Sequence, residues 1–225
     1  MSTVAAVPTG RSALTAFRQV PPFAQGVVRD LRVRWALEEA GLPYDQELLA
    51  VGENHLPAYR ARQPFGQVPA YDDKDVRMFE SGAIVLHIAE RCDALLPVEP
   101  RARARAITWL FAALNTVEPP VANLAELDLF HREEPWAPLR RPGAVAAVQG
   151  RLDELAAWLG PREWLEECFT AGDLMMTTVL RILRDTDLVT RMPVLDAYVR
   201  RCEARPAFGR ALAAQMAVFA GHPPL

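Results

Sequence analysis

Two short stretches decide the fold of this chain: QPFGQVPA at residues 63–70 and FESGAI at residues 79–84. The first leads into an apolar run, Val68 to Tyr71, that predicts a β-strand. Turn-forming acidic residues separate this run from a second expected strand, Val76 to Phe79. Apolar residues then recur at helical spacing and predict a helix from Ser81 to Cys92. We therefore expect a β-hairpin followed by a closing helix.

The segment before this hairpin alternates between strand-like and helix-like patterns. Leu14 to Phe17 and Tyr44 to Val51 are expected to form strands. Between them, Leu31 to Ala40 shows helical spacing, and Gly41 is placed to end that helix. A short irregular helix is expected from His55 to Gln63. The resulting order, β-α-β-α-β-β-α, is that of a thioredoxin-like fold.

The residues after Pro100 show helical periodicity and no convincing strand, which predicts an all-helical second domain. Helices are expected at residues 103–114, 145–159 and 174–183. Thr170 and Asp173 are spaced to form a capping box at the start of the last of these helices. The expected organisation is a flexible N-terminus over residues 1–13, a thioredoxin-like domain over 14–92, a linker over 93–100 and a helical domain over 101–225.

Composition argues against several classes of function. The net charge of -3 and the pI near 5.9 give no general attraction to a nucleic-acid backbone. The opening residues lack the apolar core of a secretory signal, and no run reaches the roughly 20 apolar residues that span a bilayer. We therefore expect a cytoplasmic protein with neither a nucleic-acid nor a membrane partner. Cys92, Cys168 and Cys202 contain no Cys-x-x-Cys pair and are expected as small buried residues in helices.

A third stretch, FTAGD at residues 169–173, follows the first two in a fixed order. With this order and spacing the chain resembles the glutathione transferase family, most closely its phi-like and bacterial branches, from Leu14 to about Gly221. The resemblance implies a glutathione-binding thioredoxin-like domain, a C-terminal helical bundle, glutathione as co-substrate, no metal, and a homodimer. The first helix of the second domain is expected to supply the contact between subunits, through Ala106, Trp109, Leu110 and Ala113.

Glutathione presents two carboxylates, one ammonium group and a peptide backbone, and each needs its own partner. In the resembled family the peptide bond before Pro69 is cis, and the N–H and C=O of Val68 pair with the cysteinyl part of glutathione like an added strand. Ser81 opens a helix whose unpaired N–H groups and dipole favour a carboxylate, so it should hold the γ-glutamyl carboxylate. Glu80 is the expected partner of the ammonium group, directly or through a residue of the second subunit.

Two further binding positions follow from the resemblance. Gln67 matches a position that often contacts glutathione, and His55 falls where phi-like members carry a lysine that binds the glycyl carboxylate. A surface histidine without a binding role is the alternative for His55, which is a weaker donor than lysine at neutral pH. His131 has no second histidine at ligand spacing, so no metal site is expected.

Enzymes of this family must ionise the glutathione thiol, and they usually supply a Tyr, Ser or Cys for this purpose near the end of the first strand or the start of the first helix. Residues 18–30 of this chain contain no Tyr, Ser, Thr or Cys. Two explanations stay open. The backbone N–H groups around Gly26 to Val28, assisted by Arg18 or Arg29, stabilise the thiolate, or the protein binds glutathione with little transferase activity.

The resemblance implies an enzyme that joins the sulfur of glutathione to a small hydrophobic electrophile. Glutathione-dependent reduction of disulfides or peroxides is a second possibility, since it needs no cysteine of the protein. A non-catalytic protein that binds glutathione or a hydrophobic ligand is a third possibility, which the empty hydroxyl position favours.

Overall fold

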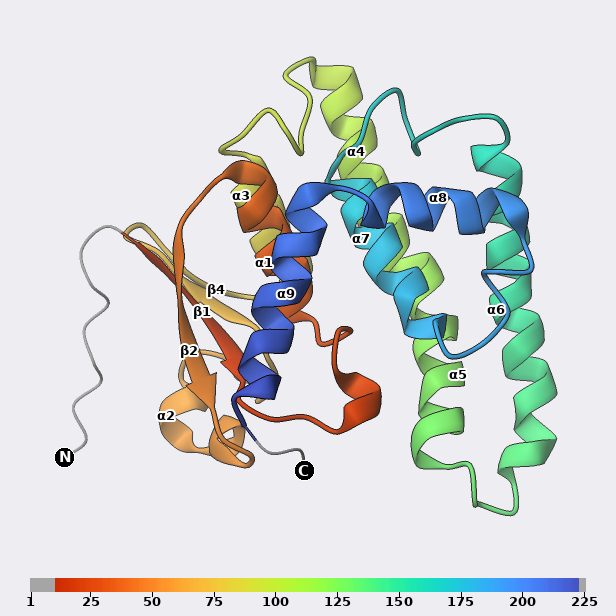
Figure 1. The fold of residues 1–225 in the computed structure, drawn as a ribbon, viewed down its shortest axis with the longest axis horizontal. Helices are drawn as coiled ribbons and strands as arrows, with labels where there is room; N and C mark the ends of the chain where they lie inside the picture. Colours follow the sequence, from red (N-terminus) through yellow and green to blue (C-terminus); the bar gives the residue numbers. More distant parts are fainter. Residues whose placement is uncertain (1–10, 223–225) are drawn as a thin grey trace. The chain divides into compact units, whose positions relative to one another are not determined.

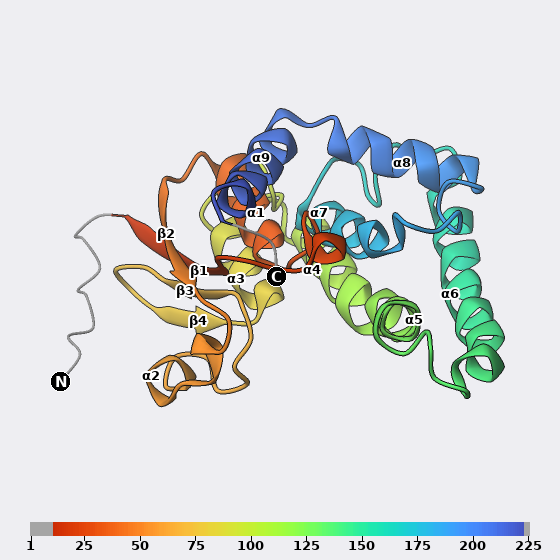
Figure 2. The same cartoon turned by 60° about the horizontal axis from the view of Figure 1, so that its bottom comes forward.

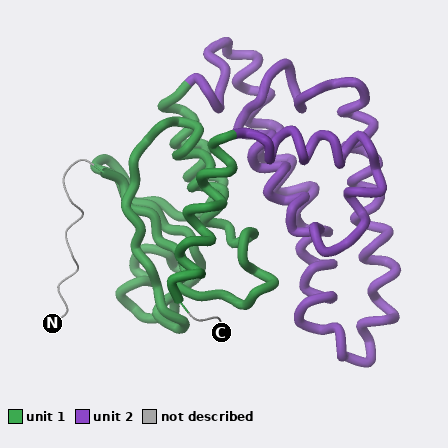
Figure 3. Tube along the Cα trace, viewed as in Figure 1, with its two compact units in different colours: residues 1–92, 206–225 green, residues 93–205 purple. Residues whose placement is uncertain are grey.

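The chain's structure is a computed structural model that describes residues 11–222. Residues 11–92 and 206–222 form one compact unit, and residues 93–205 form a second (Figure 3). The division falls at residue 92, where the sequence predicted the first domain to end, but the last helix belongs to the first unit and not to the helical domain. The predicted flexible N-terminus lies outside the described residues up to residue 10, and Ser12 and Ala13 already form part of the first strand.

The first unit has the predicted thioredoxin-like fold (Figure 1). Its sheet has the order β2-β1-β3-β4, with β2 parallel to β1 and the other two pairs antiparallel. Helices α1 and α3 cover one face of the sheet and α2 lies at the other (Figure 2). The elements are β1 (Ser12–Phe17), η1 (Pro22–Ala24), α1 (Asp30–Ala40), β2 (Tyr44–Leu49), η2 (Glu53–His55), α2 (Pro57–Arg60), β3 (Ala70–Asp72), β4 (Arg77–Phe79), α3 (Ser81–Ala89) and α9 (Pro206–Ala220).

Helix α1 forms the centre of the first unit. Gly41 ends it in the left-handed conformation, with φ of 65°, as its position after the helical pattern predicted. Leu31 to Leu37 are all buried, and Trp35 packs edge-on against Phe208 of α9 with ring centroids 4.8 Å apart. Helix α9 therefore joins the first unit because it covers a side of α1 that the sheet leaves open.

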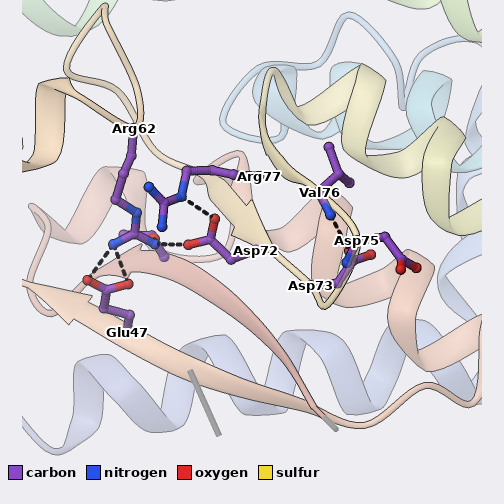
Figure 4. Close-up of polar contacts among 8 residues, drawn as sticks. Glu47, Arg62, Asp72, Asp73, Asp75, Val76 and Arg77 are labelled. Atoms are coloured by element: carbon purple, nitrogen blue, oxygen red, sulfur yellow. Dashed lines mark hydrogen bonds and ion pairs between the residues drawn. The ribbon is translucent and has the colours of Figure 1, made fainter. Parts of the chain in front are cut away.

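An ion network connects the end of α2 to the sheet (Figure 4). Arg62 donates to both carboxylate oxygens of Glu47 on β2, at 2.7 and 2.6 Å, and to Asp72 on β3 at 2.6 Å. Arg77 on β4 donates to the second oxygen of Asp72 at 2.7 Å. The guanidinium of Arg62 thus joins β2, β3 and the segment after α2, and Arg77 adds β4 through Asp72.

The turn between β3 and β4 is built around the carboxylate of Asp73, whose side chain is 9% exposed. One oxygen accepts the N–H groups of Asp75 and Val76 at 2.8 and 2.9 Å (Figure 4), and the other pairs with His87 and Arg91 from the far end of α3. Burial opposes ionisation of this carboxyl, but the hydrogen bonds from His87 and Arg91 outweigh it and hold the pKa of Asp73 well below its usual range.

A carboxyl with a depressed pKa in the folded state stabilises the fold above its unfolded pKa, and this contribution is lost as the pH falls toward its folded pKa. We expect Asp73→Asn to lower the free energy of unfolding by about 2 kcal/mol at pH 7, and by clearly less at pH 3. Urea unfolding at both pH values measures this difference. Asp75→Asn is the control, because the Asp75 side chain is 57% exposed. A loss from Asp73→Asn that is the same at both pH values would rule out this account of the turn.

The second unit is a bundle of helices, as predicted. Thr170 and Asp173 form the predicted capping box, with the Thr170 N–H donating to Asp173 at 2.9 Å. A π-helical turn, η3, joins α4 to α5, and Pro119 and Pro120 in the first turn of α5 interrupt the backbone hydrogen bonding. The elements are α4 (Pro100–Ala112), η3 (Ala113–Val117), α5 (Glu118–Phe130), α6 (Ala137–Leu159), α7 (Ala171–Leu180), η4 (Arg181–Leu183) and α8 (Pro193–Glu203).

Two sequence expectations for this half of the chain are corrected, and the predicted linker ends one residue earlier than expected. Its residues Leu95 and Leu96 are buried, and its last residue, Pro100, already belongs to α4. Ala106, Leu110 and Ala113 are fully buried within the chain, so they cannot form the predicted subunit contact. Of the cysteines, only Cys202 is fully buried in a helix, whereas Cys168 is exposed in the loop before α7. Among residues 11–222, no helix is long and apolar enough to cross a membrane.

Gly172 allows α7 to approach α4 closely. A Cβ atom at this position would lie 2.6 Å from the Cβ of Trp109 and 3.1 Å from the C=O of Ala106. Neither of these atoms is the end of a flexible side chain, so one helix would have to move.

We expect Gly172→Ala to lower the free energy of unfolding by about 1–3 kcal/mol, the usual range for overpacking a core. Gly150→Ala is the matched control: Gly150 lies within α6 with nothing within 4 Å of its added Cβ, so alanine should be neutral or slightly stabilising there. We expect a lower urea midpoint of unfolding for Gly172→Ala than for Gly150→Ala. Equal midpoints for the two variants would show that this approach of the helices is not tight.

Candidate functional site

The loop before Val68 is held by side chains of the preceding segment. Asn54 donates its amide N–H to the C=O of Gly66, and Tyr59 donates its hydroxyl to the C=O of Gln67, both at 2.7 Å. Gln63 accepts the N–H of Phe65 at 2.7 Å. These hydrogen bonds fix the backbone of three consecutive residues, 65–67, and therefore determine the direction of the chain where it reaches Val68.

Gly66 is required for this arrangement. Its φ is 66°, in the region that favours glycine, and an added Cβ would lie 2.9 Å from the C=O of Asn54.

Two residues predicted to bind glutathione, His55 and Gln67, are both exposed. His55 lies against Asn54, with ring Nε2 and amide Nδ2 3.3 Å apart.

Val68 presents its backbone and buries its side chain. The Val68–Pro69 peptide is cis. The side chain packs with Leu49, Tyr59 and Ala70, and Phe17 and Val28 pack against the same cluster. No hydrogen bond within residues 11–222 uses the N–H or C=O of Val68, so both backbone groups still need a partner.

Helix α3 opens at Ser81 with the expected free donors. The first N–H groups of any helix lack partners within it, and here they belong to Ser81, Gly82 and Ala83. The hydroxyl oxygen of Ser81 accepts a hydrogen bond from the buried Arg32 of α1 at 3.2 Å. With its oxygen engaged in this way, the hydroxyl proton is directed away from Arg32 and is available to an anion. Sequence analysis gave no signal for Arg32, because the contact spans 49 residues.

Glu80, the residue before this helix, has an uncommon backbone conformation. Its φ of 69° and ψ of 111° make it the one non-glycine residue with positive φ in the described part of the chain. Such a conformation costs of the order of 1–3 kcal/mol and persists only where the surrounding structure enforces it. The side chain of Glu80 is exposed beside the helix start, where it can pair with a cation.

Two apolar residues lie at or next to the segment without a hydroxyl or thiol side chain, residues 18–30. Phe17 ends β1, and Val28 lies in the turn before α1; both are apolar and only partly buried. The N–H of Val27 donates to the C=O of Ala24 at 3.1 Å, whereas no hydrogen bond among the described residues uses the N–H of Val28. Val28 therefore offers a backbone donor beside the cluster that holds Val68.

The two arginines named with Val28 lie on either side of it in the chain. Arg18 directly follows β1, is half-buried, and donates its backbone N–H to the C=O of Leu49 at 2.8 Å. Arg29 is exposed at the N-cap of α1. Among residues 11–222, no group of three or more His, Cys, Asp or Glu side chains is placed to hold a metal.

A thioredoxin-like unit combined with a helical unit defines the fold class, and comparison with known proteins names the family. Residues 24–90 match the family described as Glutathione S-transferase, N-terminal domain. Glutathione S-transferase 4 of Zea mays is 31% identical over 208 residues, covering 85% of this chain and 90% of the relative. The disulfide-bond oxidoreductase YfcG of Escherichia coli is 28% identical over 191 residues, covering 78% and 86%. The chain belongs to the glutathione S-transferase family.

Solved structures agree with this fold. A glutathione transferase from Pseudomonas putida, whose crystal structure holds one glutathione disulfide per subunit, matches with a TM-score of 0.80 at 21% identity, over 92% of this chain and 93% of that one. Poplar glutathione transferase F1 matches with a TM-score of 0.78 at 23% identity, over 93% and 100%.

The backbone of Glu80 gives a direct test of local strain. We expect Glu80→Gly to raise the free energy of unfolding by about 1 kcal/mol, because glycine adopts positive φ without a steric cost. Glu80→Gln keeps the Cβ atom and the strain, so its stability should stay within about 0.5 kcal/mol of the parent protein. Urea unfolding at pH 7 compares the three proteins. A glycine variant no more stable than the glutamine variant would mean that the backbone is not strained there.

Proposed function

We propose that this protein is a glutathione transferase that joins the thiolate of glutathione to small hydrophobic electrophiles. The observation that carries the proposal is that one compact unit contains both the unpaired backbone of Val68, whose side chain packs in one cluster with Phe17 and Val28, and the start of α3 at Ser81. Family membership supports glutathione as the ligand. A cytoplasmic location and a homodimeric state belong to the same proposal and rest on the family alone.

In this proposal each part of glutathione has its own partner. The γ-glutamyl carboxylate accepts the hydroxyl and N–H of Ser81, and the helix dipole of α3 favours its charge. Glu80 pairs with the ammonium group. The cysteinyl N–H and C=O pair with Val68 next to the cis bond to Pro69, as a strand pairs with a sheet edge. The glycyl carboxylate faces Gln67 and His55, whose exposed side chains flank the loop.

The sulfur then lies near Val28. A free thiol has a pKa of about 8.5, and lowering it by two units takes about 2.7 kcal/mol of preferential stabilisation of the thiolate. The unpaired N–H of Val28 supplies a hydrogen bond to the anion, and Arg18 or Arg29 adds positive charge from nearby. The thiolate attacks the electrophilic carbon, a C–S bond forms, and the leaving group departs with its electron pair.

Glutathione-dependent disulfide reduction is the second candidate. It is favoured by the relative from Escherichia coli that is named as a disulfide-bond oxidoreductase. Here the thiolate attacks a disulfide sulfur and displaces the other sulfur as a thiol, and a second glutathione completes the exchange to glutathione disulfide. No cysteine of the protein takes part in these steps.

Calorimetric titration with glutathione tests the binding site. We expect Glu80→Gln to weaken binding about tenfold, which corresponds to about 1.4 kcal/mol. Glu90→Gln removes the same charge just beyond the opposite end of α3 and should bind as the parent protein does. Two variants with equal affinity would remove Glu80 from the site, and absence of binding by the parent protein would overturn the proposal.

Two assays on the parent protein separate the candidate reactions. Conjugation of a generic aryl halide above the uncatalysed rate supports the transferase, and glutathione–disulfide exchange without conjugation supports the reductase. Activity in neither assay, together with retention on immobilised glutathione, would identify a binding protein instead.

A further inference from the structure

Helix α9 is tied to both ends of α1. Near the end of α1, Arg210 donates to the carboxylate of Glu38 at 2.7 Å, and both residues lie near the surface. Near the start of α1, Gln215 donates its side-chain amide to the carboxylate of Asp30 at 2.7 Å and to the C=O of Val28 at 3.2 Å. The hydrogen bonds of Gln215 are buried, since Gln215 is fully inaccessible and Asp30 is 1% exposed.

The orientation of the Gln215 amide is fixed by what faces it. Asp30 and Val28 offer only acceptors, so the NH₂ group must point toward them, and the amide oxygen is left without a partner. The other oxygen of Asp30 accepts from Arg34 at 2.6 Å. Burial raises the pKa of Asp30 above its ordinary value, against the lowering effect of Arg34. A buried carboxylate in this state needs every donor that surrounds it.

The turn that contains Val28 lies between two regular elements of the first unit. Residues 25–29 lie between η1 and α1 and include Gly26 with φ of 78°. The C=O of Val28 accepts the N–H of Leu31 at 2.9 Å, and the amide of Gln215 is its second donor. Fixing this carbonyl fixes the peptide plane on one side of Val28, and the N–H proposed to face the sulfur lies on the other side of the same residue.

We propose that Gln215 is a positioning residue for thiol activation: it holds Val28 so that the backbone N–H of this residue points at the glutathione sulfur. This inference rests on the proposed function, because it assigns a role within that site. It also explains why the last helix of the chain packs against the first unit. Gln215 lies 187 residues from Val28 in the sequence, which is why no local pattern indicates the connection.

The test compares two variants that each remove one tie between α9 and α1. We expect Gln215→Met, which keeps the size of the side chain but has no donor, to lower kcat for conjugation about tenfold, while the affinity for glutathione changes less than about threefold. The affinity is preserved because Val68 and Ser81 still hold the tripeptide. Arg210→Met should keep the parent kcat. The ultraviolet absorption of the bound thiolate at pH 7 should fall for Gln215→Met only.

A third variant and a second readout separate positioning from a general loss of packing. Gln215→Lys, which can still donate to Asp30 and Val28, should restore kcat to within about threefold of the parent value. Amide hydrogen exchange of residues 26–31 should be faster in Gln215→Met than in Arg210→Met. If Gln215→Met does not fold, Gln215→Leu, which also has no donor, takes its place.

The outcomes distinguish this inference from the proposed function. If the parent protein binds and conjugates glutathione and Gln215→Met has the parent kcat and thiolate absorption, the role of Gln215 is wrong and the proposed function stands. Equal losses in Gln215→Met and Arg210→Met would also overturn the role. If the parent protein neither binds nor conjugates glutathione, the proposed function fails and the role of Gln215 fails with it.

Discussion

The proposed site depends on one constraint: the N–H and C=O of Val68 must stay free of hydrogen bonds to the described residues while its side chain stays buried. Two hydrogen bonds enforce this, from Asn54 to the C=O of Gly66 and from Tyr59 to the C=O of Gln67. Burial raises the pKa of Tyr59 to about 12, so its hydroxyl stays a donor throughout the physiological range. The hydrogen bond from Tyr59 to the C=O of Gln67 is therefore kept at neutral pH.

The rest of the first unit arranges partners around that backbone. The ion network of Arg62 fixes the start of the loop, and Arg32 of α1 engages the hydroxyl of Ser81. Helix α1 is thereby connected to α3 at one place and to α9 at both of its ends. Since α1 carries no exposed catalytic hydroxyl at its start, its contribution to chemistry would come from backbone geometry. Geometry of this kind needs a rigid support, which α9 provides.

Strain and charge are concentrated beside the start of α3. Glu80 has positive φ and an exposed carboxylate, and Ser81 is buried and offers its N–H and hydroxyl. An unfavourable backbone conformation next to unpaired donors is a common feature of sites that bind ligands. The helical unit shows no such feature at its capping box: Thr170 and Asp173 satisfy each other and the surrounding backbone, which indicates a role in folding.

The sequence alone determined the order of elements, the thioredoxin-like and helical fold classes, the family, the capping box and the stretch that contains Val68 and Ser81. These features are local: spacing of apolar residues, turn residues and short motifs act over a few positions. The assignments of His55, Gln67, Glu80 and Ser81 to glutathione stay predictions. Only the tertiary structure decided that α9 belongs with the first unit, that the predicted linker is packed, and that Ala106, Leu110 and Ala113 are buried. The tertiary structure also showed that Arg32 contacts Ser81 and that Gln215 contacts Val28. These contacts join residues 49 and 187 positions apart, so they depend on how helices pack, and no periodic pattern in the sequence indicates them.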